Sequence, residues 1–345
     1  MAITVRSFAK INLGLRIGAK RPDGFHELRT VYQTVALHDL VGVQVEPGSG
    51  IEIRCGDPRV PRNEANTCYR VVERLMTALK AKGRVVLEIE KRLPVEGGLG
   101  GASGDAVAAM LALEQALGKP LPGRERLRIA AEVGSDLPLF LIGGTVLGVG
   151  RGEQVYPLPD LPAYPCVIAT PEIGVSTPKA FEDWDALTLS GDGFELCPES
   201  TGSSDPGKLT GWQASARMEA FGRRVSSWLS GVPGQNVSRG RPSGVPAGGR
   251  GRAEIPLLDL VRTGIENDFE RVVFPQYPEL REVKRVLERS GAQYASLSGS
   301  GSALYGLFQT RAAAESTAAQ LRKAGVPAQA TSTLTRAQYW KKFRV

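Results

Sequence analysis

The sequence predicts an α+β protein with two domains. The chain of 345 residues is longer than one domain of ordinary size, and strand-like alternation is interspersed with helical spacing in both halves. A stretch rich in Gly, Ser and Pro, with almost no apolar periodicity, interrupts the second half at about 190–256. We therefore expect one domain over residues 1–160 and another over residues 161–345, with a disordered insertion at about 190–256 in the second.

The first half is expected to hold most of the strands. Alternating apolar and polar residues, and one β-branched run, predict strands at 2–8, 11–17, 28–36, 40–54, 84–93, 144–149 and 153–157. Helical spacing of apolar residues predicts helices within 63–83 and at 103–118, 123–132 and 136–142. In the helix at 103–118, Ser103 is the expected N-cap and Gly118 the expected end.

The second half mixes both kinds of element on a smaller scale. The strands expected here are 164–169, 293–297, 303–308 and 327–332. The helices expected are one short helix near 211–229, one at 279–289 and one at 311–324 that is closed by Gly325. The elements after residue 257 together predict a compact α+β unit.

The formal net charge of +7 comes mainly from one stretch. Residues 220–253 contain no Asp or Glu and six arginines, namely Arg223, Arg224, Arg239, Arg241, Arg250 and Arg252. RNA binding through this stretch is an alternative, but its aromatic residues are limited to Phe221 and Trp228 and it holds no recognised RNA motif. We therefore expect no nucleic-acid partner.

The cysteines and the hydropathy favour a cytoplasmic protein without a membrane partner. Cys55, Cys68, Cys166 and Cys197 are scattered, with no CxxC pair and no histidine cluster nearby. This pattern predicts reduced thiols and no metal site. The sequence has no run of 18 apolar residues, and its first residues lack the features of a secretory or transit peptide.

A glycine-rich loop, PVEGGLGGASGDA at 94–106, lies between a predicted strand and a predicted helix. In this arrangement backbone N–H groups and the positive end of the helix dipole point at one spot, which suits a phosphate. The P-loop pattern GxxxxGK[ST] is absent, and the dinucleotide pattern GxGxxG fails at Ser103. A flexible connection without a ligand is the alternative interpretation.

Pro94, Gly98, Leu99, Gly100 and Ser103 resemble the PxxxGLGSSA signature of the GHMP kinases. Two further motifs of this superfamily match SFAKINLGLRI at 7–17 and SLSGSGSALYGLF at 296–308. The resemblance implies an N-terminal domain like ribosomal protein S5 domain 2 and a ferredoxin-like C-terminal domain. It also implies an ATP-dependent kinase that uses Mg²⁺. The ATP-binding residues implied are Asn66, Pro94, Gly97, Gly98, Leu99, Gly100, Gly101, Ala102 and Ser103.

Three longer segments narrow the resemblance to one branch of the superfamily. They are KINLGLRIGAKRPDGFHEL (10–28), GSDLPLFLIGGTVLGVGRGEQV (134–155) and ENDFERVVFPQYPEL (266–280). The branch implied is one that phosphorylates the 2-hydroxyl of a small cytidine diphosphate compound in the non-mevalonate isoprenoid pathway, as a monomer or weak homodimer. Another small-molecule GHMP kinase and a catalytically weakened nucleotide-binding protein remain the alternatives.

The catalytic pair that the resemblance implies is Lys10 and Asp136. Asp136 would take the proton from the substrate hydroxyl, while Lys10 orients that carboxylate and stabilises charge near the γ-phosphate. From the residues alone, Asp136 could instead cap a helix and Lys10 could reach solvent from its strand.

The substrate residues that the resemblance implies lie in four short segments. They are Asn12, Phe25, His26, Thr177, Phe181, Gly299, Ser300 and Gly301. His26 would bond the cytosine edge, with Phe25 and Phe181 as aromatic walls, and the amides of the loop at 297–302 would face phosphate groups. The alternatives are that Phe181 is a core residue of an amphipathic helix and that 297–302 is a tight hairpin.

Three residues depart from the family pattern PxGxGLGGGSSDA. Glu96 and Ala102 replace glycines, and Gly104 replaces a serine. The negative charge of Glu96 is expected to repel a polyphosphate unless it turns away or approaches Mg²⁺. Gly104 lacks a hydroxyl that could touch a phosphate, and Asp105 is expected to substitute for it in part.

Overall fold

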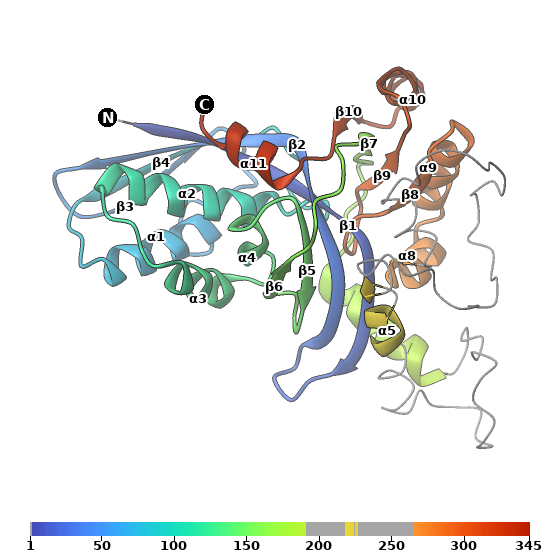
Figure 1. The fold of residues 1–345 in the computed structure, drawn as a ribbon, viewed down its shortest axis with the longest axis horizontal. Coiled ribbons are helices and arrows are strands. Elements are labelled where there is room, and N and C mark those ends of the chain that lie inside the picture. Colours follow the sequence, from blue (N-terminus) through green and yellow to red (C-terminus); the bar gives the residue numbers. More distant parts are fainter. Residues whose placement is uncertain (1, 191–217, 224, 227–264) are drawn as a thin grey trace.

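The computed structural model describes residues 2–190, 218–223, 225–226 and 265–345 (Figure 1). Most of the insertion expected at 190–256 lies outside the described residues, so its expected disorder stays a prediction. Within the helix expected near 211–229, residues 218–223 and 225–226 are helical. None of the helices described here is long and apolar enough to cross a membrane.

The first sheet has six strands, in the order β3-β4-β2-β5-β6 with β1 paired to β2. They are β1 (Ile3–Lys20), β2 (His26–Glu46), β3 (Gly50–Cys55), β4 (Arg84–Glu90), β5 (Thr145–Val149) and β6 (Gln154–Pro157). The pair β3–β4 is parallel, and the other pairs are antiparallel.

The strand boundaries expected in the first 54 residues were partly wrong. The segments 2–8 and 11–17 form one strand, β1, whose register against β2 shifts at Phe8/Ala9 and again at Asn12/Gly14. Such bulges let a strand bend without ending. The segment 40–54 is instead divided between β2 and β3, because Gly48 (φ +120°) and Gly50 (φ +99°) turn the chain between them.

Four helices are interspersed with these strands: α1 (Thr67–Ala78) lies between β3 and β4, and α2 (Gly101–Leu117), α3 (Gly123–Val133) and α4 (Leu137–Phe140) lie between β4 and β5. Figure 1 shows α1, α2 and α3 lying together beside the sheet. The prediction that Ser103 caps α2 is wrong, since α2 begins at Gly101 after Gly100, which has φ +69°. Gly118 ends this helix in the left-handed conformation, as predicted.

The second sheet has four antiparallel strands in the order β10-β7-β9-β8. They are β7 (Pro165–Ala169), β8 (Tyr294–Leu297), β9 (Leu304–Leu307) and β10 (Ala328–Ser332). The helices of this part are α5 (Thr177–Ser190), α8 (Glu270–Gln276), α9 (Pro278–Arg289) and α10 (Arg311–Lys323). The helical segments α5 and α8 were not among the elements expected from the sequence.

A shared core joins the two sheets. Buried residues of β1 and β2, such as Ile11 and Val31, pack in one cluster with Cys166, Ile168 and Tyr305 of β7 and β9. Burial of these apolar side chains removes them from water and stabilises the contact between the sheets. The proposed domain boundary near residue 160 falls between β6 and β7, within this continuous packing.

The helix α11 (Arg336–Phe343), also missed by the sequence analysis, returns to the first sheet. Its Tyr339 and Phe343 are members of the core cluster formed by the first sheet and its helices, and the Tyr339 hydroxyl donates to the Phe140 carbonyl at 2.7 Å. Val5 and Arg344 form an isolated β-bridge, and the labelled N and C ends lie close together in Figure 1.

Candidate active site

The two glycine-rich loops predicted from distant parts of the sequence are in direct contact. The Ser298 hydroxyl donates to the Gly98 carbonyl at 2.9 Å, and the Ala303 amide donates to the Gly97 carbonyl at 3.0 Å. A Cβ atom on Gly98, which has φ +74°, would lie 2.0 Å from the Ser298 carbonyl oxygen. Only glycine permits this approach between the two backbones.

The first loop is also bound to β1. The Lys10 amide donates to the Leu99 carbonyl at 2.9 Å, and a Cβ on Gly100 would lie 3.0 Å from the Lys10 side chain. The loop continues into the N-terminus of α2, where residues 101–103 begin the helix and their amide groups have no earlier helical carbonyl to bond. This is a site at which backbone amides and the helix dipole can receive an anion.

Asn66 lies at the start of α1, beside this helix terminus. Its side-chain oxygen accepts from the Cys68 amide at 2.8 Å, and its amide group donates to the Pro61 carbonyl at 2.7 Å. The next residue, Thr67, donates its hydroxyl to the Ala102 carbonyl at 2.9 Å. The starts of α1 and α2 are therefore held side by side, with Asn66 serving as a cap.

Position 104 faces the interior. A Cβ on Gly104 would lie 2.8 Å from the Ser7 hydroxyl oxygen and 2.9 Å from the Phe8 carbonyl oxygen. A side chain there would point toward β1, and the Ser7 hydroxyl fills much of that space. The absence of a serine hydroxyl at 104 therefore changes the packing against β1 rather than the surface of the loop.

Asp105 is 3% exposed and was wrongly expected to replace the hydroxyl missing at 104. Its carboxylate accepts from Lys91 Nζ at 2.9 Å, and Lys91 also bonds to Asp39, which is fully buried. Burial and the nearby Asp39 charge raise the pKa of Asp105 to about 7. The cluster Lys91–Asp39–Asp105 lies beneath the loop, since a Cβ on Gly101 would be 3.3 Å from Lys91 Nζ.

Glu96 is exposed, at the outer side of the loop. It has φ +65°, a conformation that is unfavourable for a residue with a Cβ. The pKa of Arg59 is raised mainly by its hydrogen bond to Asp57, and the negative charge of Glu96 contributes to this shift. The glycine that the family pattern has at this position would adopt the same turn without strain.

Lys10 and Asp136 meet as an ion pair, with Lys10 Nζ 3.3 Å from Asp136 Oδ2. The Lys10 side chain is 4% exposed and that of Asp136 is 31% exposed, so the lysine does not reach bulk solvent from its strand. Asp136 occupies the N-cap position of α4 but makes no capping hydrogen bond. Its carboxylate is thus not used in the way that the alternative interpretation required.

Three further side chains, those of Asn12, Thr30 and Tyr32, belong to this polar group. Lys10 Nζ donates to Asn12 Oδ1 at 2.7 Å, and Asn12 Nδ2 donates to Thr30 Oγ1 at 2.8 Å. Tyr32, which the sequence analysis missed, donates its hydroxyl to Asp136 Oδ1 at 3.0 Å. Its position in a predicted strand, next to Val31, gave no signal that its hydroxyl has a polar role.

The second glycine loop reaches the same place. A Cβ on Gly299 would lie 3.5 Å from Lys10 Nζ and 3.6 Å from Asn12 Oδ1. The Ser300 hydroxyl lies 2.7 Å from that of Thr177 at the start of α5. Asn267, also missed, supports the loop by donating to the carbonyls of Leu297 at 2.9 Å and Gly299 at 2.7 Å.

The aromatic residues lie farther along the β1–β2 hairpin. The His26 and Phe181 rings are stacked, with centroids 4.9 Å apart and planes 9° apart. His26 Nε2 lies 2.7 Å from Asp185 Oδ1, an acidic partner that the sequence analysis missed. Phe25 is 50% exposed, and the guanidinium of Arg151 lies 4.7 Å from its ring centroid. Phe181 also packs against the buried apolar cluster of the second sheet and its helices, so it is both a core contact and a neighbour of His26.

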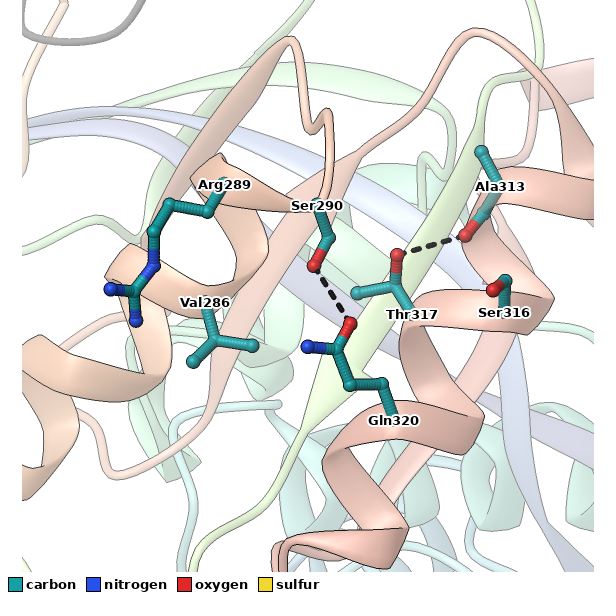
Figure 2. A pocket seen from close by; sticks show the side chains of 7 residues that line it. All are labelled: Val286, Arg289, Ser290, Ala313, Ser316, Thr317 and Gln320. Carbon is teal, nitrogen blue, oxygen red and sulfur yellow. Dashed lines mark hydrogen bonds between the residues drawn. The ribbon is translucent and has the colours of Figure 1, made fainter.

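The candidate site is defined by these groups, and it is distinct from the hollow between α9 and α10. A pocket between α9 and α10 has a volume of about 460 Å³, and none of the expected site residues lines it. Figure 2 shows the side chains that line this pocket. There Ser290 donates to Gln320 at 3.1 Å and Thr317 to the Ala313 carbonyl at 2.9 Å, so these polar groups satisfy one another. Across the described parts of the chain, no three His, Cys, Asp or Glu residues are grouped so as to hold a metal ion.

Two family models match the chain. The family model for the GHMP kinases N terminal domain matches residues 66–144, and that for the GHMP kinases C terminal domain matches residues 255–327. The fold and these two matches define an ATP-dependent small-molecule kinase that transfers a phosphoryl group to an alcohol.

The most similar relatives that we compared share one enzyme name. The chain is 38% identical over 307 residues to the 4-diphosphocytidyl-2-C-methyl-D-erythritol kinase of Solibacter usitatus, covering 89% of this chain and 81% of that protein. It is 33% identical over 324 residues to the enzyme of the same name from Acaryochloris marina, covering 94% and 92%. The chain belongs to the GHMP kinases, within the family of these 4-diphosphocytidyl-2-C-methyl-D-erythritol kinases.

Solved structures give the same fold. A crystal structure of 4-(cytidine 5'-diphospho)-2C-methyl-D-erythritol kinase matches with a TM-score of 0.66 and 28% identity, covering 96% of this chain and 99% of that one. A homoserine kinase from Cytophaga hutchinsonii has the same TM-score at 21% identity, covering 97% and 95%. The second match, at its low identity, shows the shared fold alone.

Proposed function

We propose that this chain transfers the γ-phosphoryl group of ATP to the 2-hydroxyl of 4-diphosphocytidyl-2-C-methyl-D-erythritol. The observation that carries the proposal is the ion pair of Lys10 and Asp136, which lies where β1, the first glycine loop and the second glycine loop meet. The names of the relatives supply the substrate, and the non-mevalonate isoprenoid pathway follows from it.

In the proposed reaction Asp136 is the general base. The substrate hydroxyl oxygen attacks the γ-phosphorus, its proton passes to the Asp136 carboxylate, and the bond from phosphorus to the oxygen of ADP breaks. Lys10, held by Asn12 at 2.7 Å, keeps a positive charge beside both the carboxylate and the transferred group. Such fixed charges stabilise the loose transition state of phosphoryl transfer.

ATP is proposed to bind along the first glycine loop and the start of α2. The free amides of residues 101–103, and the close backbone approach at Gly98 and Gly100, suit a polyphosphate. Asn66 would then act near the adenine by fixing the start of α1. Mg²⁺ commonly binds through the phosphates of the nucleotide and only one or two protein carboxylates. We therefore propose that Mg²⁺ enters this site together with ATP.

The cytidine end of the substrate is proposed to bind near His26, with Phe25 and Phe181 as aromatic contacts. The helix α5 links this end to the reaction centre, since it carries Phe181 and begins at Thr177, which bonds to Ser300. The amides of Gly299, Ser300 and Gly301 would face the diphosphate of the substrate.

An ATP-to-ADP assay with this cytidyl substrate, run with and without Mg²⁺, tests the proposal. We expect Mg²⁺-dependent turnover, and a loss of at least about a hundredfold in kcat for Asp136→Asn at saturating substrates, as for loss of a general base. Homoserine and mevalonate serve as alternative acceptors. Turnover of only one of these, or ATP binding without any phosphorylated product, would overturn the proposal.

A further inference from the structure

Tyr32 presents its hydroxyl to the carboxylate that we have proposed as the general base. The hydroxyl donates to Asp136 Oδ1 at 3.0 Å, whereas Lys10 Nζ faces the other oxygen, Oδ2, at 3.3 Å. Tyr32 is 2% exposed. Its burial and the adjacent Asp136 charge raise the pKa of the phenol well above its usual value, so the group stays a proton donor at neutral pH.

The position of the Tyr32 hydroxyl is fixed from several sides. Tyr32 lies in β2, opposite Asn12 of β1 and Val146 of β5. A Cβ on Gly148 would lie 2.5 Å from the Tyr32 ring, and one on Gly152 would lie 2.4 Å from its hydroxyl oxygen. Two glycines of the β5–β6 hairpin therefore leave room for this ring and hydroxyl in one position.

Asp136 itself is weakly held by its own segment. It precedes the four-residue helix α4 and makes no capping bond there. In the part of the chain that the structure describes, the side chain of Asp136 contacts Tyr32 and Lys10, so loss of the Tyr32 hydroxyl would leave Lys10 alone. Because Tyr32 and Lys10 take different carboxylate oxygens, the pair fixes the rotation of the carboxylate as well as its place.

We propose that Tyr32 is a positioning residue, which holds Asp136 Oδ1 so that Oδ2, beside Lys10, is the oxygen that receives the substrate proton. This inference rests on the proposed function of Asp136 as general base, but it does not depend on which alcohol is the acceptor. Tyr32 makes no contact with the reacting atoms in this role.

The variant Tyr32→Phe keeps the ring between Gly148 and Gly152 and removes only the hydroxyl. A hydrogen bond to a charged group is worth about 1.5–3 kcal/mol, so we expect kcat to fall by roughly tenfold or more. The KM values for ATP and for the alcohol should stay within about twofold, because an interaction that orients the base does not bind either substrate.

Tyr339→Phe is the matched control. It removes another buried tyrosine hydroxyl that bonds to the same short segment, at the Phe140 carbonyl, but that bond does not involve the Asp136 carboxylate. We expect a lower melting temperature and an unchanged kcat for this control. An equal loss of kcat in both variants would mean that Tyr32 only stabilises α4, and would overturn the inference.

A double-variant cycle with Asp136→Asn gives the second test. If Tyr32 acts through Asp136, Tyr32→Phe should cause no further loss of kcat once Asp136 is replaced. An additive loss, an unchanged kcat in Tyr32→Phe, or a change confined to KM would each overturn the role of Tyr32. If another alcohol proves to be the acceptor, the proposed substrate is wrong, and the same cycle with that alcohol decides the role of Tyr32.

Discussion

Gly98 and Ser298 lie 200 positions apart in the sequence, yet the Ser298 hydroxyl donates to the Gly98 carbonyl at 2.9 Å. The contact joins the loop before α2 to the loop between β8 and β9. Because both loops border Lys10, the first half and the second half of the chain each supply one side of the candidate site.

We expect Gly98→Ala to disrupt this junction. Its Cβ would lie 2.0 Å from a backbone oxygen at φ +74°, so the loops must separate. The KM for ATP should rise at least about tenfold, and the melting temperature should fall. Gly118→Ala is the control, since Gly118 has φ +63° but nothing within 4 Å of its Cβ position. That control should lose about 1 kcal/mol of stability through strain alone and keep its KM.

Glu96→Gly is expected to improve ATP binding. The change removes a residue with φ +65° from a left-handed turn and removes a negative charge at the edge of the loop. The KM for ATP should fall by about two- to threefold at low salt, as one exposed charge is lost. Glu96→Gln removes the charge but keeps the strain, so both variants should lower KM, while only Glu96→Gly should unfold at higher temperature.

Asp185→Asn is expected to weaken discrimination between bases. The carboxylate can only accept, so His26 donates to it through Nε2, and in the neutral form of the ring Nδ1 is then an acceptor. The acceptor Nδ1 then suits the amino group of cytosine and not the carbonyl of uracil. The ratio of kcat/KM for the cytidyl over the uridyl substrate should fall by about tenfold.

Asp183→Asn controls for this change, because Asp183 lies on the same helix and bonds to Lys179 at 2.9 Å and Gln276 at 2.8 Å. The ratio should not change in this variant. A ratio that stays constant in Asp185→Asn as well would show that the pair does not select the base.

Asp105 should make the protein less stable as the pH rises from about 4 to about 7. Its folded-state pKa is raised from 3.8 to about 7, so in this window the folded protein binds more protons than the unfolded chain. The free energy of unfolding then falls with increasing pH. The contribution is fully present below pH 4 and is lost on passing through pH 7.

The variant Asp105→Asn should flatten this dependence. We would measure the free energy of unfolding of both proteins with urea at several pH values. The value for the variant, relative to that for the original protein, should increase as the pH rises toward 7. A constant difference between pH 4 and pH 8 would contradict the raised pKa of Asp105.

The fold and the meeting of Lys10 with Asp136 could be anticipated because their motifs have characteristic local sequences. Two side-chain partners of the site residues, Tyr32 and Asp185, could not be anticipated. Each contact depends on packing between elements that are distant in the sequence. Tyr32 looks like a core residue of a strand, and Asp185 lies in α5, a helix that was not expected from the sequence. The contact of Tyr32 arises only when the segment before α4 lies against β2, and that of Asp185 only when α5 lies against the β1–β2 hairpin.

Local propensity also misplaced the start of α2. Ser103 has the chemistry of an N-cap, but the left-handed Gly100 lets the helix begin at Gly101. The reason is tertiary: Gly98 and Gly100 are pressed against Ser298 and Lys10, which sets where the chain can turn. Asn66, in contrast, caps α1 through its own side chain, a bond that depends on neighbouring residues alone.

The return of α11 to the first sheet has a consequence for how the protein forms. The core of that sheet and its helices is drawn from residues up to Val146, together with Leu334, Tyr339 and Phe343. The first half of the chain therefore cannot fill its own interior until residues 334–343 are available. Although the described residues form two sheets, the assembly of the first sheet requires both ends of the chain, and thermal unfolding should follow a single cooperative transition.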